Sequence, residues 1–514
     1  MTTNAAPSLS RLSSTDHPLV YEINTRVLLG ELSRTEGKKV TLETLPDRVI
    51  DGWASLGFDA VWLMGVWTTG KRSLEIAASE PDLLKGYRQV LQDFRVQDVV
   101  GSPYAVRSYT VAPALGGASG LASIRRRLAK RGMGLILDFV CNHTARDHRW
   151  VSDHPEYYIQ GEEGDDVQRP ADFFSVTTKA GSKVVAFGKD PYFPGWTDTA
   201  QLNHFHPGMR RALIGKMEQI AEQCDGVRCD MAMLVLEDVF QRTWGATLAS
   251  PDSSTTQGEF WKEAIAAVRA ERPGFLFIAE AYWNLEWPLQ QLGFDFTYDK
   301  TLYDRLLKEG ATAVYEHLRA EMDYQRRSLR FIENHDEVRA ARALSSPAWH
   351  CAAAALISTV PGMVLYHEGQ MEGRNTRVPV QLGRRPDEPV SEQVQQFYRR
   401  LLEVVSSGPF RRGSWRLLHA RAAWHENASL NNFLAFLWQS GKEARLVVVN
   451  YAPLNGQCYL EIPLSEVKGS AFEFRDLLSR AVFVRERSVL ESKGMYFDLP
   501  PYGLHIFGVK PLRS

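Results

Sequence analysis

The sequence predicts an α/β protein whose larger part is a (β/α)8 TIM barrel and whose C-terminal part is an all-β domain. Between residues 20 and 366, eight short apolar segments alternate with segments of helical periodicity. After about residue 410, short apolar strands follow one another with turn residues between them. We therefore expect a barrel with a short inserted subdomain after its third strand, followed by a small β-sandwich.

The expected barrel strands are short apolar runs bounded by turn residues. They are residues 20–27, 59–65, 134–140, 226–230, 274–280, 294–298, 329–335 and 362–366. Helical spacing of apolar residues is found at 45–56, 80–92, 118–131, 206–224 and 260–271. Strands that alternate with helices favour parallel pairing. An open doubly wound sheet is the alternative, but no glycine-rich phosphate motif follows any of the strands.

The domain boundaries follow from changes in composition and pattern. The segment 144–203 lacks long periodic stretches and is rich in His, Asp, Gly and Pro, which predicts an inserted subdomain. The barrel would then consist of 1–143 and 204–408, with the C-terminal β-sandwich domain at 409–514. The strands expected in that last domain are 433–438, 445–450, 458–462, 472–476 and 505–509.

The composition is that of an ordinary globular protein, with 44% hydrophobic residues and a net charge of -1 over 514 residues. This balance gives no electrostatic reason to expect nucleic acid or an anionic membrane as a partner. Five cysteines at irregular spacing fit no metal motif and predict buried free thiols in a reducing compartment. The first residues lack the apolar core of a secretory signal, and the apolar run 349–366 is interrupted by polar residues, so we expect a cytoplasmic protein.

Acidic residues stand at the ends of several expected strands, where a barrel of this kind carries its active site. They are Asp138, Asp230, Glu280 and Asp336. Carboxylates that converge on one opening repel each other, so function explains them better than stability. Arg228 and Asp230 lie two residues apart and should share one face of their strand. The alternatives are a structural ion pair for Arg228 and Asp230, and a solvated strand-end acid for Glu280.

Two carboxyl groups of different character predict cleavage of a glycosidic bond. Glu280 is flanked by apolar and aromatic residues, and such a setting favours a protonated acid that can protonate the leaving oxygen. Asp230 lies beside a cation, which favours an ionised nucleophile. Aromatic residues that could stack on sugars are Trp67, Tyr192, Phe193, Trp196, Tyr282 and Trp283, although such residues also fill cores.

Four short motifs resemble those of the α-amylase family, glycoside hydrolase family thirteen, in the same order. They are Asp138-Phe-Val-Cys-Asn-His143, Gly226-Val-Arg-Cys-Asp230, Phe277-Ile-Ala-Glu280 and Phe331-Ile-Glu-Asn-His-Asp336. The segment 361–370 is also similar to the family's eighth-strand segment, so the resemblance extends over residues 18 to about 405.

The resemblance implies a role for each matched residue. Asp230 would be the nucleophile, Glu280 the general acid and base, and Asp336 the group that holds sugar hydroxyls in the transition state. Arg228 would orient Asp230. The residues expected to contact the sugar at the cleavage site are Tyr104, His143, His335 and Arg339.

The chain also departs from the family pattern. Met233 and Leu234 stand where many members carry a Lys-His pair that lines the leaving-group side, which puts ordinary endo-acting starch digestion in doubt. No cofactor is required by the resemblance. Asn142 matches a calcium ligand of calcium-dependent members, whereas the acidic run at 162–166 is expected to be a solvated loop, so calcium stays open.

These observations favour a retaining hydrolase of α-1,4-linked glucose oligosaccharides and polysaccharides. A glucanotransferase or disaccharide isomerase that uses the same residues is the first alternative, because apolar Met233 and Leu234 could reduce the access of water. A sugar-binding homologue without activity is a remote alternative, since all three acids are present.

Overall fold

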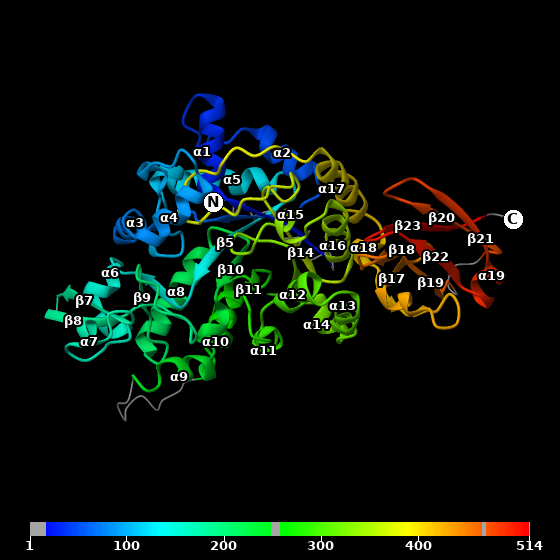
Figure 1. Cartoon of the computed structure of the whole chain (residues 1–514). Helices are drawn as coiled ribbons and strands as arrows, with labels where there is room; N and C mark the ends of the chain where they lie inside the picture. Colours follow the sequence, from blue (N-terminus) through cyan, green and yellow to red (C-terminus); the bar gives the residue numbers. More distant parts are fainter. Residues whose placement is uncertain (1–16, 180, 248–257, 465–468, 513–514) are drawn as a thin grey trace, which may run out of the picture.

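The computed structural model describes residues 17–179, 181–247, 258–464 and 469–512 (Figure 1). The expectations for the first 16 residues lie outside this part of the chain. The described residues form three regions: the barrel, the insertion and the C-terminal domain. Figure 1 shows the insertion on one side of the central barrel and the C-terminal domain on the opposite side.

Eight strands form the predicted closed barrel, in the order β1-β14-β13-β12-β11-β10-β5-β2. They are β1 (Leu19–Asn24), β2 (Ala60–Met64), β5 (Gly134–Val140), β10 (Gly226–Asp230), β11 (Leu276–Ala279), β12 (Phe296–Tyr298), β13 (Ser328–Arg330) and β14 (Met363–His367). Every neighbouring pair is parallel, and β1 closes the ring by pairing with both β2 and β14. The predicted fold class is therefore confirmed, and the open-sheet alternative is wrong.

The barrel strands carry almost only buried side chains, because helices cover their outer faces. One cluster of buried side chains fills the interior, and it includes Val20, Trp62, Ile136, Ile278 and Leu365. Each such side chain contributes roughly 1.5–3 kcal/mol relative to an exposed one. The interior is thus a packed core, and the strand ends form the opening.

Helices connect the strands. The longer ones are α1 (Thr25–Glu36), α2 (Asp47–Ser55), α4 (Pro81–Val90), α5 (Gly117–Ala129), α8 (Pro207–Ala221), α10 (Phe260–Glu271), α12 (Lys300–Lys308), α16 (Pro347–Thr359) and α17 (Glu392–Val405). The shorter ones are α3 (Lys71–Ala77), α9 (Glu237–Trp244), α11 (Glu286–Gln291), α13 (Ala311–Leu318), α14 (Met322–Arg326), α15 (Ala340–Ala343) and α18 (Pro409–Arg412). All five helices predicted by spacing are present, with ends shifted by a few residues.

Two predicted strands are too long for physical reasons that the structure makes clear. The first strand stops at Asn24, whose side chain accepts a hydrogen bond from the Val27 backbone N–H and caps α1. The seventh stops at Arg330. Beyond it, the Asn334 side chain accepts hydrogen bonds from the backbone N–H groups of Asp336 and Glu337, which turns the chain at the opening.

The insertion begins and ends in a short antiparallel ladder between β6 (His143–Ala145) and β9 (Thr199–Gln201). Its outer part is a hairpin of β7 (Phe173–Thr178) and β8 (Gly181–Ala186), with α6 (Arg149–Asp153) and α7 (Asp165–Gln168). The ladder places His143 at the junction of insertion and barrel. We keep 144–203 as the proposed bounds of this subdomain. A second hairpin, β3 (Trp67–Thr69) with β4 (Val106–Val111), follows the second barrel strand.

The C-terminal domain consists of two antiparallel sheets, as the sequence predicts. The larger sheet has the order β15 (Ser414–Leu418), β17 (Phe433–Ser440), β18 (Glu443–Asn450), β23 (Leu504–Pro511), β20 (Ala471–Asp476) and β21 (Val482–Glu486). The smaller has the order β16 (Ala420–Arg421), β19 (Gly456–Leu460) and β22 (Met495–Leu499), and α19 (Arg487–Ser492) lies near them. The domain docks on the barrel helices, where the Trp438 indole donates to the Thr359 carbonyl over 2.6 Å.

Candidate active site

Arg228 joins two acids at the opening of the barrel. Its side chain lies on the same face of β10 as Asp230, as strand alternation predicts, and its Nη1 is 2.5 Å from Asp230 Oδ1. Its Nη2 is 2.7 Å from Glu280 Oε1, at the end of β11. The guanidinium is fully buried and lies over the rings of Trp62, Tyr104 and Tyr298. One cation therefore holds the two predicted catalytic carboxyl groups beside each other.

Glu280 is enclosed and firmly oriented. Its Oε2 accepts a hydrogen bond of 2.5 Å from the Met231 backbone N–H, and the Tyr282 hydroxyl donates to Oε1 over 3.0 Å. Burial, opposed by Arg228, raises the pKa of this carboxyl to about 7. Met231 has a φ of 44°, a left-handed conformation that non-glycine residues rarely adopt. Such strain directly after Asp230 is typical of a functional site.

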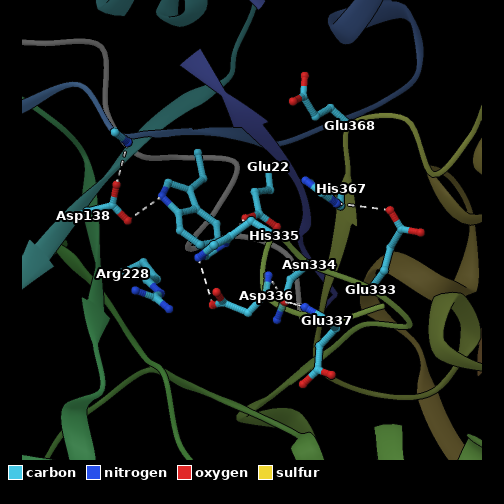
Figure 2. A network of polar contacts seen from close by, with 12 residues as sticks. Glu22, Asp138, Arg228, Glu333, Asn334, His335, Asp336, Glu337, His367 and Glu368 are labelled. Atoms are coloured by element: carbon cyan, nitrogen blue, oxygen red, sulfur yellow. Dashed lines mark hydrogen bonds and ion pairs between the residues drawn. The ribbon is translucent and has the colours of Figure 1, made fainter. Parts of the chain in front are cut away.

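Asp336 belongs to a hydrogen-bonded group on the other side of the opening (Figure 2). Its Oδ2 is 2.9 Å from His335 Nε2, and the Tyr104 hydroxyl is 2.6 Å from the same nitrogen. Desolvation inside the opening would raise the pKa of Asp336, but the His335 imidazolium outweighs this effect and holds that pKa below its ordinary value. The Asp336 side chain is 46% exposed, so this carboxylate faces the opening and is available to a ligand.

Asp138 has a structural position. Its two carboxylate oxygens accept hydrogen bonds from the Trp62 indole N–H (3.1 Å) and the Gly65 backbone N–H (2.9 Å). Burial raises the pKa of this carboxyl to about 6. The rings of Trp62 and His335 meet edge to face, with their centroids 5.6 Å apart. Asp138 therefore supports the wall of the site through its hydrogen bond to Trp62.

His143 lies at the start of β6, with its ring 5.1 Å from that of Trp196. Burial lowers the pKa of His143, so its imidazole is neutral near pH 7 and can either donate or accept a hydrogen bond. The Asp230 carboxyl group opposes part of this lowering of the His143 pKa, so the ring lies within the electrostatic reach of that acid. This neighbourhood is compatible with the predicted sugar contact.

Arg339 lies behind the opening instead of in it. Its Nη1 donates to Glu333 Oε1 over 2.6 Å and to the Glu368 carbonyl over 2.7 Å, and the side chain is 2% exposed. The predicted sugar contact is not supported by this placement, because the guanidinium is enclosed and already bonded. We propose a structural role for Arg339, in which it fixes the segment that follows β13.

Met233 and Leu234 are buried in the 3-10 turn Ala232–Val235 and pack in the main core. They therefore do not line the opening, and their apolar character says nothing about the access of water to it. The predicted aromatic residues differ in exposure. Trp67 is buried and donates to the Asp138 carbonyl, and Trp196 and Tyr282 are half-buried. Tyr192, Phe193 and Trp283 are exposed, and the rings of Tyr192 and Trp283 meet edge to face with their centroids 5.0 Å apart.

Two residues of the site were not singled out by the sequence analysis. Tyr298, at the end of β12, accepts a hydrogen bond of 3.3 Å from Arg228 Nε. Glu22, on β1, is 2.5 Å from His335 Nδ1. Both residues are polar, lie in strands that are mostly apolar, and point into the barrel by the alternation of side chains along a strand. The single acid in the run Leu-Val-Tyr-Glu-Ile-Asn could therefore have indicated a functional residue.

The surroundings of Asn142 do not fit a calcium site. The Asn142 carboxamide oxygen accepts from Gln201 Nε2 at 3.0 Å, and its Nδ2 donates to Gln201 Oε1 at 3.2 Å. The two amides thus satisfy each other, and calcium prefers several carboxylate oxygens. Within the described ranges, no group of three or more His, Cys, Asp or Glu side chains is arranged to hold a metal ion.

We expect EDTA to leave the unfolding temperature unchanged, because the Asn142–Gln201 amide pair holds the junction of insertion and barrel without an ion. Differential scanning calorimetry of the protein with excess EDTA, and again after addition of CaCl2, measures this. A lower unfolding temperature in EDTA that calcium restores would contradict the expectation.

Comparisons with known proteins identify the family of the chain. The family model for the alpha amylase catalytic domain matches residues 49–412. A curated relative, alpha-amylase MalA of Haloarcula japonica, is 26% identical over 445 residues, which are 84% of this chain and 55% of the relative. Alpha-amylase 3 of Dictyoglomus thermophilum is 23% identical over 307 residues, 55% of this chain and 54% of the relative. The chain spans about half the length of these curated relatives.

Solved structures show the same fold over nearly the whole chain. The noncanonic maltogenic alpha-amylase AmyB from Thermotoga neapolitana superimposes with a TM-score of 0.67 at 20% identity, over 97% of this chain and 100% of that one. An alpha-amylase from Lactobacillus plantarum gives a TM-score of 0.65 at 18% identity, over 96% and 99%. Among the described residues, no helix is long and apolar enough to cross a membrane.

Proposed function

Since the chain belongs to the alpha-amylase family, we propose that it is a retaining α-glycoside hydrolase that acts on α-1,4-linked glucose oligosaccharides and polysaccharides by double displacement. The observation that carries this proposal is the Arg228 guanidinium, which bonds the carboxyl groups of both Asp230 and Glu280 at the same opening. Two carboxyl groups side by side, one of them with a raised pKa, are what an acid-assisted displacement needs.

In the first step, the Asp230 carboxylate attacks the anomeric carbon while the bond from that carbon to the leaving oxygen breaks. Glu280 gives its proton to the leaving oxygen, so that a neutral hydroxyl departs and a glycosyl ester of Asp230 forms. Arg228 bonds Asp230 Oδ1 and orients this carboxyl group for the attack. The pKa of about 7 leaves a large fraction of Glu280 protonated at neutral pH.

In the second step, a water molecule attacks the same carbon from the side that the leaving group vacated. The Glu280 carboxylate takes a proton from this water, and the bond to Asp230 breaks. Two inversions restore the original configuration. The retaining mechanism is favoured because the Asp230 and Glu280 carboxyl groups bond the two terminal nitrogens of one guanidinium and therefore lie near each other, as the two acids of retaining enzymes do.

The sugar at the cleavage site would lie between the two catalytic acids and the group on the other side of the opening. Asp336 offers carboxylate oxygens to sugar hydroxyls, and Tyr104 and His143 offer ring surfaces and polar atoms. The exposed pair of Tyr192 and Trp283 lies at the rim and suits stacking on the next sugar ring. Because Met233 and Leu234 are buried, they no longer favour transfer over hydrolysis.

A time course of products tests the proposal. The purified protein is incubated with maltose, maltoheptaose, sucrose, trehalose or soluble starch, and the products are separated by chromatography. Short maltooligosaccharides from maltoheptaose and starch are expected. Elongated or rearranged sugars would contradict hydrolysis and indicate a transferase activity. Sugar binding without any product would indicate a binding protein.

A further inference from the structure

Glu22 is a fully buried carboxylate at the bottom of the opening. It lies on β1, where its neighbours across the ladder are Trp62 on β2 and His367 on β14. Its Oε1 is 2.5 Å from His335 Nδ1, and its Oε2 has no hydrogen-bond partner within the part of the chain that the structure describes. Figure 2 shows the side chain beside the His335 ring, on the face away from Asp336.

The two nitrogens of His335 each face a carboxylate. Nδ1 meets Glu22, and Nε2 meets Asp336 Oδ2 at 2.9 Å. An ionised carboxylate only accepts hydrogen bonds, so both ring nitrogens must carry a proton. The ring is therefore an imidazolium. Burial would lower the pKa of His335, but Asp336 and Glu22 outweigh burial and raise that pKa well above its ordinary value.

The titratable groups around this imidazolium come from four barrel strands. Asp138 approaches from β5, Arg228 from β10 and His367 from β14, besides Glu22 itself on β1. His367 is neutral, because burial lowers its pKa to about 3, and Asp138 already bonds Trp62 and Gly65. Glu22 is thus the carboxylate that contacts the His335 ring at Nδ1, on the side away from Asp336.

Stability does not explain Glu22 well. A buried carboxylate with one unsatisfied oxygen is expensive, and an apolar residue or a glutamine at this position would cost less. The only group it bonds through its side chain, among the described residues, is His335. The His335 N–H in turn faces two acceptors, Asp336 and the Tyr104 hydroxyl.

We propose that Glu22 is a positioning residue for the reaction: by keeping His335 doubly protonated and fixed, it holds Asp336 and Tyr104 where the sugar at the cleavage site is bound. Glu22 itself does not touch the sugar. This inference rests on the proposed function, since the positions that it assigns belong to the proposed substrate site.

A double-mutant cycle tests the coupling between Glu22 and His335 with maltoheptaose as substrate. Glu22→Gln keeps the shape and removes the charge, and we expect kcat/KM to fall roughly 10- to 100-fold. In a His335→Asn background, the same substitution should change kcat/KM by less than about twofold, because Glu22 acts through His335. Equal effects of Glu22→Gln in both backgrounds would overturn the proposal.

Glu368→Gln is the matched control. Glu368 is also a buried carboxylate that follows a barrel strand and bonds a cation, since its Oε2 accepts from Arg385 at 2.9 Å. We expect this variant to lose thermal stability and to keep kcat/KM within about twofold. If Glu22→Gln and Glu368→Gln lost activity alike and in proportion to stability, Glu22 would be merely structural.

A second measurement needs neither turnover nor a variant of Glu22. Nitrogen-15 NMR of the protein labelled at histidine reports the protonation of each ring, and His335→Asn identifies the signal. At a pH of about 8, where an ordinary histidine is neutral, we expect both His335 nitrogens to carry protons. A neutral ring would overturn the inference. An imidazolium in a protein that cleaves none of the glucosides would instead refute the proposed function alone.

Discussion

Asp230→Asn is expected to lower kcat on maltoheptaose by roughly 10⁴-fold or more, because it removes the nucleophile of the first step. The amide has nearly the shape of the carboxylate, and Arg228 retains its bond to Glu280, so the site should stay assembled. Steady-state rates measured beside the unfolding temperature separate lost chemistry from lost folding. A variant with more than a tenth of the wild-type kcat would contradict the assignment.

Asp225→Asn is the matched control for this substitution. Asp225 directly precedes the same strand, at the opposite end from Asp230, and its Oδ1 is 2.7 Å from Arg125 Nη2. The bottom of a barrel serves stability rather than catalysis. We expect kcat to be unchanged and the free energy of unfolding to fall by about 1–3 kcal/mol, because Asp225 also accepts a hydrogen bond from the Leu135 backbone N–H.

Glu280→Gln is expected to lower kcat on maltoheptaose by roughly 10²- to 10⁴-fold, because glutamine cannot protonate the leaving oxygen. The protonated form of Glu280 is the active one. Wild-type kcat/KM should therefore fall as the pH rises through about 7, the pKa that burial gives this carboxyl. The variant should lose that alkaline limb, and pH profiles of both proteins measure it.

Substrate choice sharpens the same test. A nitrophenyl maltooligoside has a leaving group that departs without a proton, so Glu280→Gln should cleave it with a much smaller loss in the first step. Glu286→Gln is the control, because Glu286 is a buried acid on α11 whose carboxylate lies beside Thr301 instead of Arg228. It should keep the alkaline limb. An unchanged limb in Glu280→Gln would assign the acid to another group.

The barrel could be predicted from the sequence because its signals are local. Segment 134–140 is apolar except for Asp138, and segment 226–230 has apolar residues around the alternating pair Arg228 and Asp230; both are strands with the predicted bounds. The seventh strand was predicted too long because its end is fixed by the Asn334 side chain, whose hydrogen bonds to the following backbone compete with strand pairing.

Contacts within the site could be predicted from the sequence only between residues that are close together along the chain. Alternation along one strand placed Arg228 beside Asp230, but the bond from Arg228 to Glu280 joins two strands and needed the closed barrel. Likewise, Gln201 satisfies Asn142 from a position 59 residues away, which no local pattern shows.

Arg339 and Glu22 illustrate the opposite errors. Arg339 follows Asp336 closely in sequence and is expected to reach the sugar, yet its hydrogen bond to Glu333 holds the side chain in the interior of the protein. Glu22 is 313 residues from His335, so no local pattern connects the two, although they are in direct contact. Distance along the chain hides the contact between Glu22 and His335, and the closed barrel, in which β14 lies between β1 and β13, creates it.

The anomeric form of the first product tests the central claim most directly. Proton NMR of the protein mixed with maltoheptaose, recorded within the first minutes and before mutarotation, distinguishes the α from the β anomer of the new reducing end. Double displacement through Asp230 and Glu280 predicts the α anomer first. If the β anomer appeared first, the reaction would invert the configuration, and Asp230 could not be the nucleophile.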